Sequence, residues 1–208
     1  REFGIPFEDF RALDLIGTQN DSAEAIYNPE KYLLYCDPFM GQFDNRVKSG
    51  DAAGYADCAA RLSRYESHAE YGYLFRSLRA LCAFLSVKAD LGIRTRAAYL
   101  SGDKKAAKAL CTDYDAALER LDAFYAAYEQ QWMHENKPQG FDVVDLRIGG
   151  QRQRLLHCRD RLLAYAEGRL DRIEELEEPV LDCCCEEKAD GQATRAIFWH
   201  EIASANVI

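Results

Sequence analysis

Residues 110–128, LCTDYDAALERLDAFYAAY, decide the fold class of this chain, because their apolar side chains recur every three or four positions. The stripe comprises Leu110, Tyr114, Ala117, Leu121, Phe124 and Tyr128. This spacing places the apolar side chains on one face of an α-helix, and such a face is buried against neighbouring elements. The stretch therefore predicts a long core helix rather than a ligand site.

Three further segments carry the same pattern. The first begins with Asp51 as its expected N-cap, and the second can continue to Leu100 despite Gly92. Residues 101–103 then resemble the turn of a helical hairpin, and the last segment ends at Gly168. Their stripes are Tyr55, Cys58, Leu62 and Tyr65; Leu74, Leu78, Leu81 and Leu85; and Val144, Ile148, Leu155, Cys158, Leu162 and Tyr165. We therefore predict a mainly α fold, an antiparallel bundle of three to four long helices.

The chain divides into three parts by pattern: an aromatic-rich segment at 1–49, the helical bundle at 50–170 and a tail at 171–208. Asp37-Pro38 breaks the first part, and an apolar end closes the last, which we expect to dock on the bundle or on a partner. The shorter elements expected are helices at 6–15, 29–35 and 174–178, a hydrophobic element at 39–44, and extended chain at 196–199 and 203–208.

The composition argues against some classes of binding partner. The 208 residues are 48% hydrophobic and 29% charged, which is ordinary for a globular domain. A net charge of -9 argues against binding to nucleic acid or to an anionic membrane surface. No apolar run is long enough to span a bilayer. The chain begins with Arg1, which fits a processed chain or a fragment of a longer protein.

Eight cysteines are present, and several fall on apolar helix faces, where a free thiol acts as a small hydrophobe. The adjacent cysteines at 183–185 suit neither a disulfide framework nor zinc, which prefers ligands two to four residues apart. We therefore expect no metal or cofactor and a reduced, cytoplasmic protein. The cysteines are Cys36, Cys58, Cys82, Cys111, Cys158, Cys183, Cys184 and Cys185.

The connector at 132–150, WMHENKPQGFDVVDLRIGG, is unusually rich in functional side chains. Two interpretations compete: a capped, salt-bridged corner, and a site that contacts substrate or a partner domain. Gly149 and Gly150 lie in a helical pattern, where close approach of another backbone or a ligand would explain them. The candidate contact residues are Trp132, Asn136, Asp142, Asp145 and Arg147.

Common catalytic motifs are absent from the sequence. There is no glycine-rich phosphate loop after a strand, no G-x-S-x-G and no HExxH, and the four histidines are scattered. Asp142 and Asp145 can in principle do acid–base work, but we expect Asp142 just before a helix and Asp145 in its first turn. Capping and compensation of the helix dipole is therefore the favoured role for this pair.

Three blocks in order carry a family resemblance: 28–44 (NPEKYLLYCDPFMGQFD), 132–182 around WMHENKPQGFDVVDLRIGG, and 199–208 (WHEIASANVI). They resemble the C-terminal helical region of bacterial β-N-acetylhexosaminidases of glycoside hydrolase family 20. The resemblance covers about residues 7–208, with 50–131 matching mainly as helical pattern. The stretch 183–190 fits poorly and is treated as a variable insertion.

The resemblance implies a parent enzyme that removes terminal β-linked GlcNAc or GalNAc, with the substrate's acetamido group attacking the anomeric carbon. Its catalytic Asp-Glu pair would lie in a (β/α)8 barrel, and this sequence has no strand–helix alternation. The chain alone would then be inactive. It would brace its own N-terminal barrel or a homodimer, and the 132–150 corner would edge the substrate cleft.

Two other classes of function remain open. One is an independent helical adaptor whose aromatic N-terminal segment binds a protein partner. The other is a small helical enzyme that uses Asp142, Asp145 and Arg147. Ligand-induced stabilisation of the chain alone would distinguish the enzyme from an architectural domain.

Overall fold

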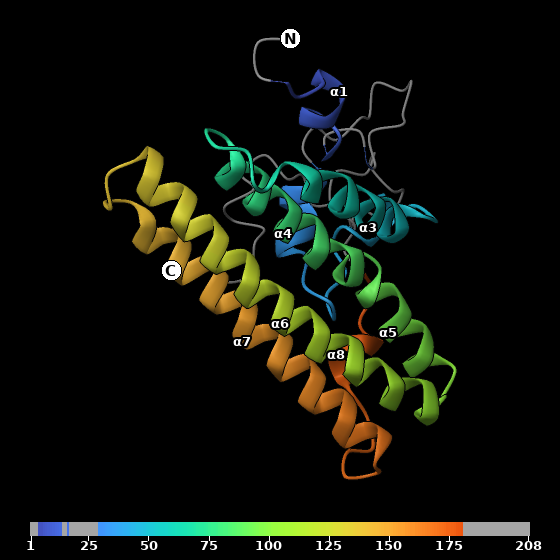
Figure 1. The fold of residues 1–208 in the computed structure, drawn as a ribbon. Coiled ribbons are helices and arrows are strands. Elements are labelled where there is room, and N and C mark those ends of the chain that lie inside the picture. The colour runs from blue at the N-terminus through green and yellow to red at the C-terminus, as the bar shows by residue number, and fades with distance from the viewer. Residues whose placement is uncertain (1–3, 14–15, 17–28, 181–208) are drawn as a thin grey trace, which may run out of the picture.

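The computed structural model describes residues 4–13, 16 and 29–180, and within these ranges it is helical with no strand. Its longest elements are α6 (Lys104–Glu135) and α7 (Phe141–Ala166), which form an antiparallel hairpin along the molecule (Figure 1). The other helices are α1 (Phe7–Phe10), α2 (Pro29–Tyr35), α3 (Asp51–Leu62), α4 (Gly72–Lys88), α5 (Leu91–Leu100) and α8 (Glu174–Glu177), with 3-10 turns at Asp44–Arg46 and Ser63–Tyr65. The mainly α prediction is confirmed.

Helix α6 is the centre of the packing. It contacts α4 and α5 on one side and α7 on the other, and α3 packs against α4 (Figure 1). Its predicted stripe is buried from Leu110 to Phe124, whereas Tyr128 is only half-buried. The predicted stripes of α3 and α7 join it in one hydrophobic cluster, so the periodicity identified these faces correctly. The predicted α4 stripe is only partly right, because Leu85 is buried but Leu74, Leu78 and Leu81 are half-buried. The large buried side chains of α4 include Phe75 and Phe84, which the stripe did not contain.

The expected continuous helix from Leu74 to Leu100 is wrong. The chain breaks after Lys88, and α5 begins at Leu91 and continues along α6 in nearly the direction of α4 (Figure 1). Gly92 lies where the loop at Pro38 approaches α5 closely: a Cβ on Gly92 would come within 2.9 Å of the Pro38 carbonyl oxygen. The glycine is therefore required by a neighbouring backbone.

Gly92→Ala should lower the free energy of unfolding by about 1–3 kcal/mol, because the added methyl group must displace the backbone at Pro38. Gly149→Ala is the matched control, since an added Cβ there meets no atom within 4 Å and should stabilise α7 by about 0.5–1 kcal/mol. Urea unfolding of the two variants measures both changes. If the free energy of unfolding changes in the same direction in both variants, Gly92 is not closely approached by the Pro38 backbone.

The predicted helix ends agree with the structure in part. Asp103 caps α6 by accepting a hydrogen bond from the Ala106 N–H (2.9 Å), and Gly168, with φ of 75°, follows the end of α7. The N-cap of α3 is Gly50 rather than Asp51. Asp51 instead starts the helix and accepts a hydrogen bond from the Lys48 N–H (2.8 Å).

The N-terminal segment packs into the same core as the bundle. Its helix α1 is shorter than the predicted 6–15, whereas α2 matches its prediction, and Leu33, Leu34 and Phe39 belong to the main cluster. Buried Lys88 donates hydrogen bonds to the carbonyls of Leu33 and Cys36 and so holds the end of α2 against α4.

The tail is described as far as residue 180. Helix α8 agrees with the acidic turn predicted at 174–178. The extended segments predicted at 196–199 and 203–208, and the cysteines at 183–185, lie outside the described residues. Within the described ranges, no helix is both long and apolar enough to cross a membrane. The division at residues 49 and 170 stays a prediction.

Candidate functional site

The α6–α7 corner is held together by aromatic packing. The Trp132 indole is half-buried, packs on Phe141 with ring centroids 5.8 Å apart, and donates from Nε1 to the Lys137 carbonyl (2.9 Å). Asn136 is the exposed C-cap of α6, and its N–H donates to the Trp132 carbonyl (2.8 Å). Trp132 is therefore held in place by residues of its own corner.

The two candidate carboxylates of the corner also have partners within the chain. Helix α7 begins at Phe141, so Asp142 lies inside the first turn rather than before it, and it accepts a hydrogen bond from the Gly140 N–H (3.1 Å). Asp145 accepts a hydrogen bond from the Tyr125 hydroxyl (2.7 Å), and this contact raises the pKa of Tyr125 to about 12. Asp145 lies beyond the first turn in which it was predicted, and no side chain caps the N-terminus of α7. The two carboxylates therefore hold the corner through hydrogen bonds within the chain rather than through the predicted helix capping.

Arg147 places its guanidinium over the Tyr35 ring of α2, at 5.3 Å from the ring centroid. The five predicted contact residues are thus spread along the corner, and none of them lines either groove described below. Gly149 has open space at its Cβ position, so no backbone of the described chain explains that glycine.

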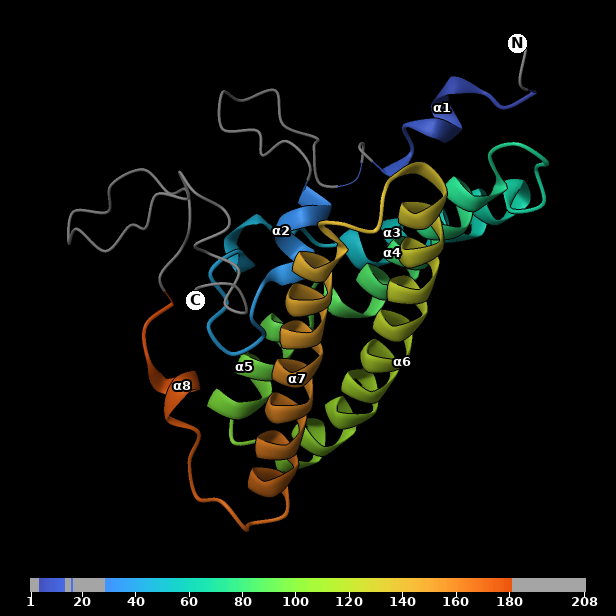
Figure 2. The ribbon, with the colours of Figure 1, turned by 90° about the vertical axis from the view of Figure 1, so that its left-hand side faces the viewer.

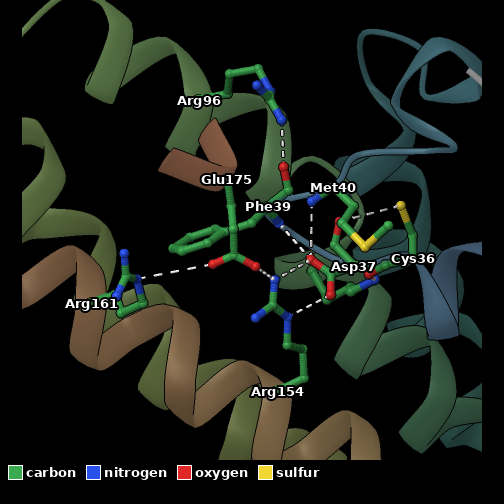
Figure 3. Close-up of polar contacts among 9 residues, drawn as sticks. Cys36, Asp37, Phe39, Met40, Arg96, Arg154, Arg161 and Glu175 are labelled. Carbon is green, nitrogen blue, oxygen red and sulfur yellow. Dashed lines mark hydrogen bonds and ion pairs between the residues drawn. The ribbon is translucent and has the colours of Figure 1, made fainter. Parts of the chain in front are cut away.

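The residue patterns did not reveal a polar network that links three distant segments, shown in Figure 3. Its centre is Asp37, which is 1% exposed and follows α2. The Asp37 carboxylate accepts hydrogen bonds from the backbone N–H groups of Phe39 (2.8 Å) and Met40 (3.0 Å). It also forms a two-point contact with Arg154 of α7, through Nε (2.5 Å) and a terminal nitrogen (3.2 Å).

Arg154 extends the network to α8. Its second partner is Glu175 (2.5 Å), and its guanidinium lies 5.5 Å from the centroid of the Phe39 ring. Burial alone would lower the pKa of Arg154, but the bonds to Asp37 and Glu175 outweigh burial and raise it. Arg161 pairs with Glu174 (3.0 Å), so α7 holds α8 at two points.

Arg96 of α5 closes the same assembly from the other side. Its guanidinium donates to the carbonyls of Leu176 (2.6 Å) and Phe39. Charged side chains therefore join the loop after α2 to α5, α7 and α8. Most of their polar atoms are hydrogen-bonded, although the buried Nε of Arg96 has no partner among the described residues. Such a set fixes the geometry of these segments.

A groove of about 550 Å³ lies beside this network. It is lined by Asp37, Met40, Gly150, Gln153, Arg154, His157 and Glu175. A second groove of about 690 Å³ runs between α5 and α6, with alanines along it and a paired Arg94 and Asp113 at its edge. Among the described residues, no group of His, Cys, Asp or Glu is placed to hold a metal ion.

No curated protein matches the chain. The family model described as the glycoside hydrolase 20C C-terminal domain matches residues 6–195, which is most of the chain. The match includes the N-terminal segment, the whole α3–α7 bundle and the polar network. The chain belongs to this family of glycoside hydrolase 20C C-terminal domains.

Proposed function

We propose that this chain is the non-catalytic helical domain of a β-N-acetylhexosaminidase that releases terminal β-linked GlcNAc or GalNAc, and that it braces the catalytic domain of the same polypeptide. The observation that carries the proposal is the family match over residues 6–195. The internal pairing of Asp142, Asp145 and Asp37 supports a structural role, because each carboxylate already serves a helix end, a tyrosine or an arginine.

A brace must hold its shape, and two features supply stiffness. The first is the α6–α7 hairpin, whose longer arm of 32 residues spans about 48 Å. The second is the network around Asp37 and Arg154, which joins the segment before the bundle to the segment after it. A rigid domain of this kind can hold a catalytic neighbour in one orientation.

The test is an activity assay of the full-length polypeptide and of this chain alone on a chromogenic β-N-acetylglucosaminide. Activity in the full-length protein and none in the chain would agree with the proposal. A full-length protein without activity, together with a protein partner bound by the N-terminal aromatic segment, would favour the adaptor. Turnover by the chain alone, abolished by Asp145→Asn, would favour the small helical enzyme.

Three finer roles stay predictions: substrate contact by the corner at 132–150, a homodimer, and a cytoplasmic location. The internal bonds of Trp132 and Asp145 favour bracing over substrate contact for the corner. The cytoplasmic location is supported by five buried cysteines that form no disulfide in the described part of the chain: Cys36, Cys58, Cys82, Cys111 and Cys158.

A further inference from the structure

The outward side of α7 exposes apolar side chains in a row. Val143 and Leu146 are more than half exposed, and Gly149 and Gly150 follow on the same side of the helix. Figure 2 shows α7 at the front of the molecule, with α6 beside it and α5 behind it. A helix that buries Ile148, Leu155 and Leu162 on its inner side does not need apolar residues outside as well.

Gly149 adds an independent argument. A glycine inside a helix costs about 0.5–1 kcal/mol relative to alanine. At Gly92 the described chain explains that cost through the Pro38 backbone, but at Gly149 an added Cβ would meet no atom of the described chain within 4 Å. A surface that is packed closely by another polypeptide would explain a bare helix backbone at this position.

The groove beside the polar network continues the same surface. It runs from Gly150 to His157 on α7, and Met40, which is 51% exposed, forms its other edge. Asp37 and Arg154 fix the base of the groove, so Met40 is held beside α7 by a rigid contact. We call this surface the α7 face: Met40, Val143, Leu146, Gly149, Gly150 and His157.

We infer that the α7 face is the surface against which the catalytic domain of the same polypeptide packs. The inference rests on the proposed function and adds the contact surface to it. In the sequence, Met40 lies N-terminal to the bundle, and under the proposed function the catalytic domain is joined to the N-terminal end of this C-terminal domain. Because the two domains are covalently linked, the catalytic domain is present at an effective concentration of about millimolar near this chain.

The size of the surface favours an attached neighbour over a second copy. A stable interface between separate chains takes roughly 20–30 residues from each side. The α7 face offers six residues, of which three are exposed apolar side chains: Met40, Val143 and Leu146. A domain already joined to this chain can pack on a surface of this extent, because contacts between domains of one chain are smaller and more polar.

The first test uses the only two methionines of this chain as probes in the native full-length protein. Met40 lies in the α7 face and Met133 lies in the α6–α7 corner, with exposed fractions of 51% and 44% in the described chain. Peroxide oxidation followed by peptide mass spectrometry should find Met40 about tenfold slower than Met133. Equal rates would overturn the inference.

The second test compares two exposed leucines in the full-length protein. Leu146→Glu places a charge in the α7 face and should speed Met40 oxidation to the Met133 rate, whereas Leu100→Glu, at a similarly exposed site on α5, should leave it slow. Identical behaviour of the two variants would overturn the inference. If the full-length protein lacks hexosaminidase activity but Met40 stays protected, the proposed function fails and the surface assignment survives.

Two other occupants of the α7 face would change the oxidation of Met40 in different ways. Protection of Met40 that disappears on dilution would assign the α7 face to a second copy of the chain. Protection that disappears when the full-length protein is cut after residue 180 would assign it to residues 181–208. Protection that survives both treatments supports the catalytic domain as the occupant.

Discussion

Arg154→Met should lower the free energy of unfolding by about 3–5 kcal/mol, the range for removing one partner of a buried ion pair. The variant removes the arginine that pairs with the Asp37 carboxylate, which is 1% exposed, and leaves Glu175 with only its longer contact to Arg161 (4.0 Å) among the described residues. The two backbone N–H groups that remain bonded to Asp37 offset only part of that loss. Urea unfolding of the chain measures the change.

The same helix provides the control. Arg152 pairs with Asp122 at 2.7 Å, but both side chains are about half exposed, so Arg152→Met should cost at most about 1 kcal/mol. A double-mutant cycle of Arg154→Met with Asp37→Asn then isolates the coupling between the two groups. Equal losses for Arg154→Met and Arg152→Met would show that the network adds nothing to stability.

The helices could be predicted from the sequence because each depends on spacing within one segment. The stripe from Leu110 to Phe124 needs no knowledge of what lies opposite to indicate burial. The break between α4 and α5 escaped prediction because the helical pattern continues across residues 89–90. The reason for Gly92 is not local either: the Pro38 backbone approaches it from more than fifty residues away, and the sequence alone shows only a glycine in a helical pattern.

The polar network could not be predicted for the same reason. Asp37 and Arg154 are 117 residues apart, and an arginine on a helix faces solvent by default. The Asp37-Pro38 break was visible, but nothing near it in the sequence indicated a buried cation partner. At the corner, the sequence alone could not decide between a structural role and ligand contact, because both use the same side-chain types. The contacts of Trp132 and Asp145 within the chain favour a structural role.

The chain should also lose stability steeply in alkali, because burial raises the pKa of Cys36 from 9.0 to about 11 and that of Tyr35 from 10.0 to about 12. In both cases the folded state keeps its proton above the pH at which the unfolded state releases it. The stabilisation is therefore complete below pH 9 and is lost as the pH rises through the folded-state values. Each group contributes roughly 2–3 kcal/mol to that loss.

Lys88 makes the chain more stable as the pH rises, which opposes the effect of Cys36 and Tyr35. Burial lowers the pKa of Lys88, so the unfolded chain keeps a proton on this amine up to about pH 10.5 after the folded chain has released it. Single substitutions therefore separate the effects of these groups better than the pH profile of the parent chain does. Urea unfolding of Cys36→Ala should show a profile that falls less between pH 9 and about 11 than that of the parent chain. Tyr35→Phe should do the same between pH 10 and about 12. If both profiles run parallel to the parent profile, the two groups titrate alike in the folded and unfolded chain, and their burial does not drive the alkaline loss.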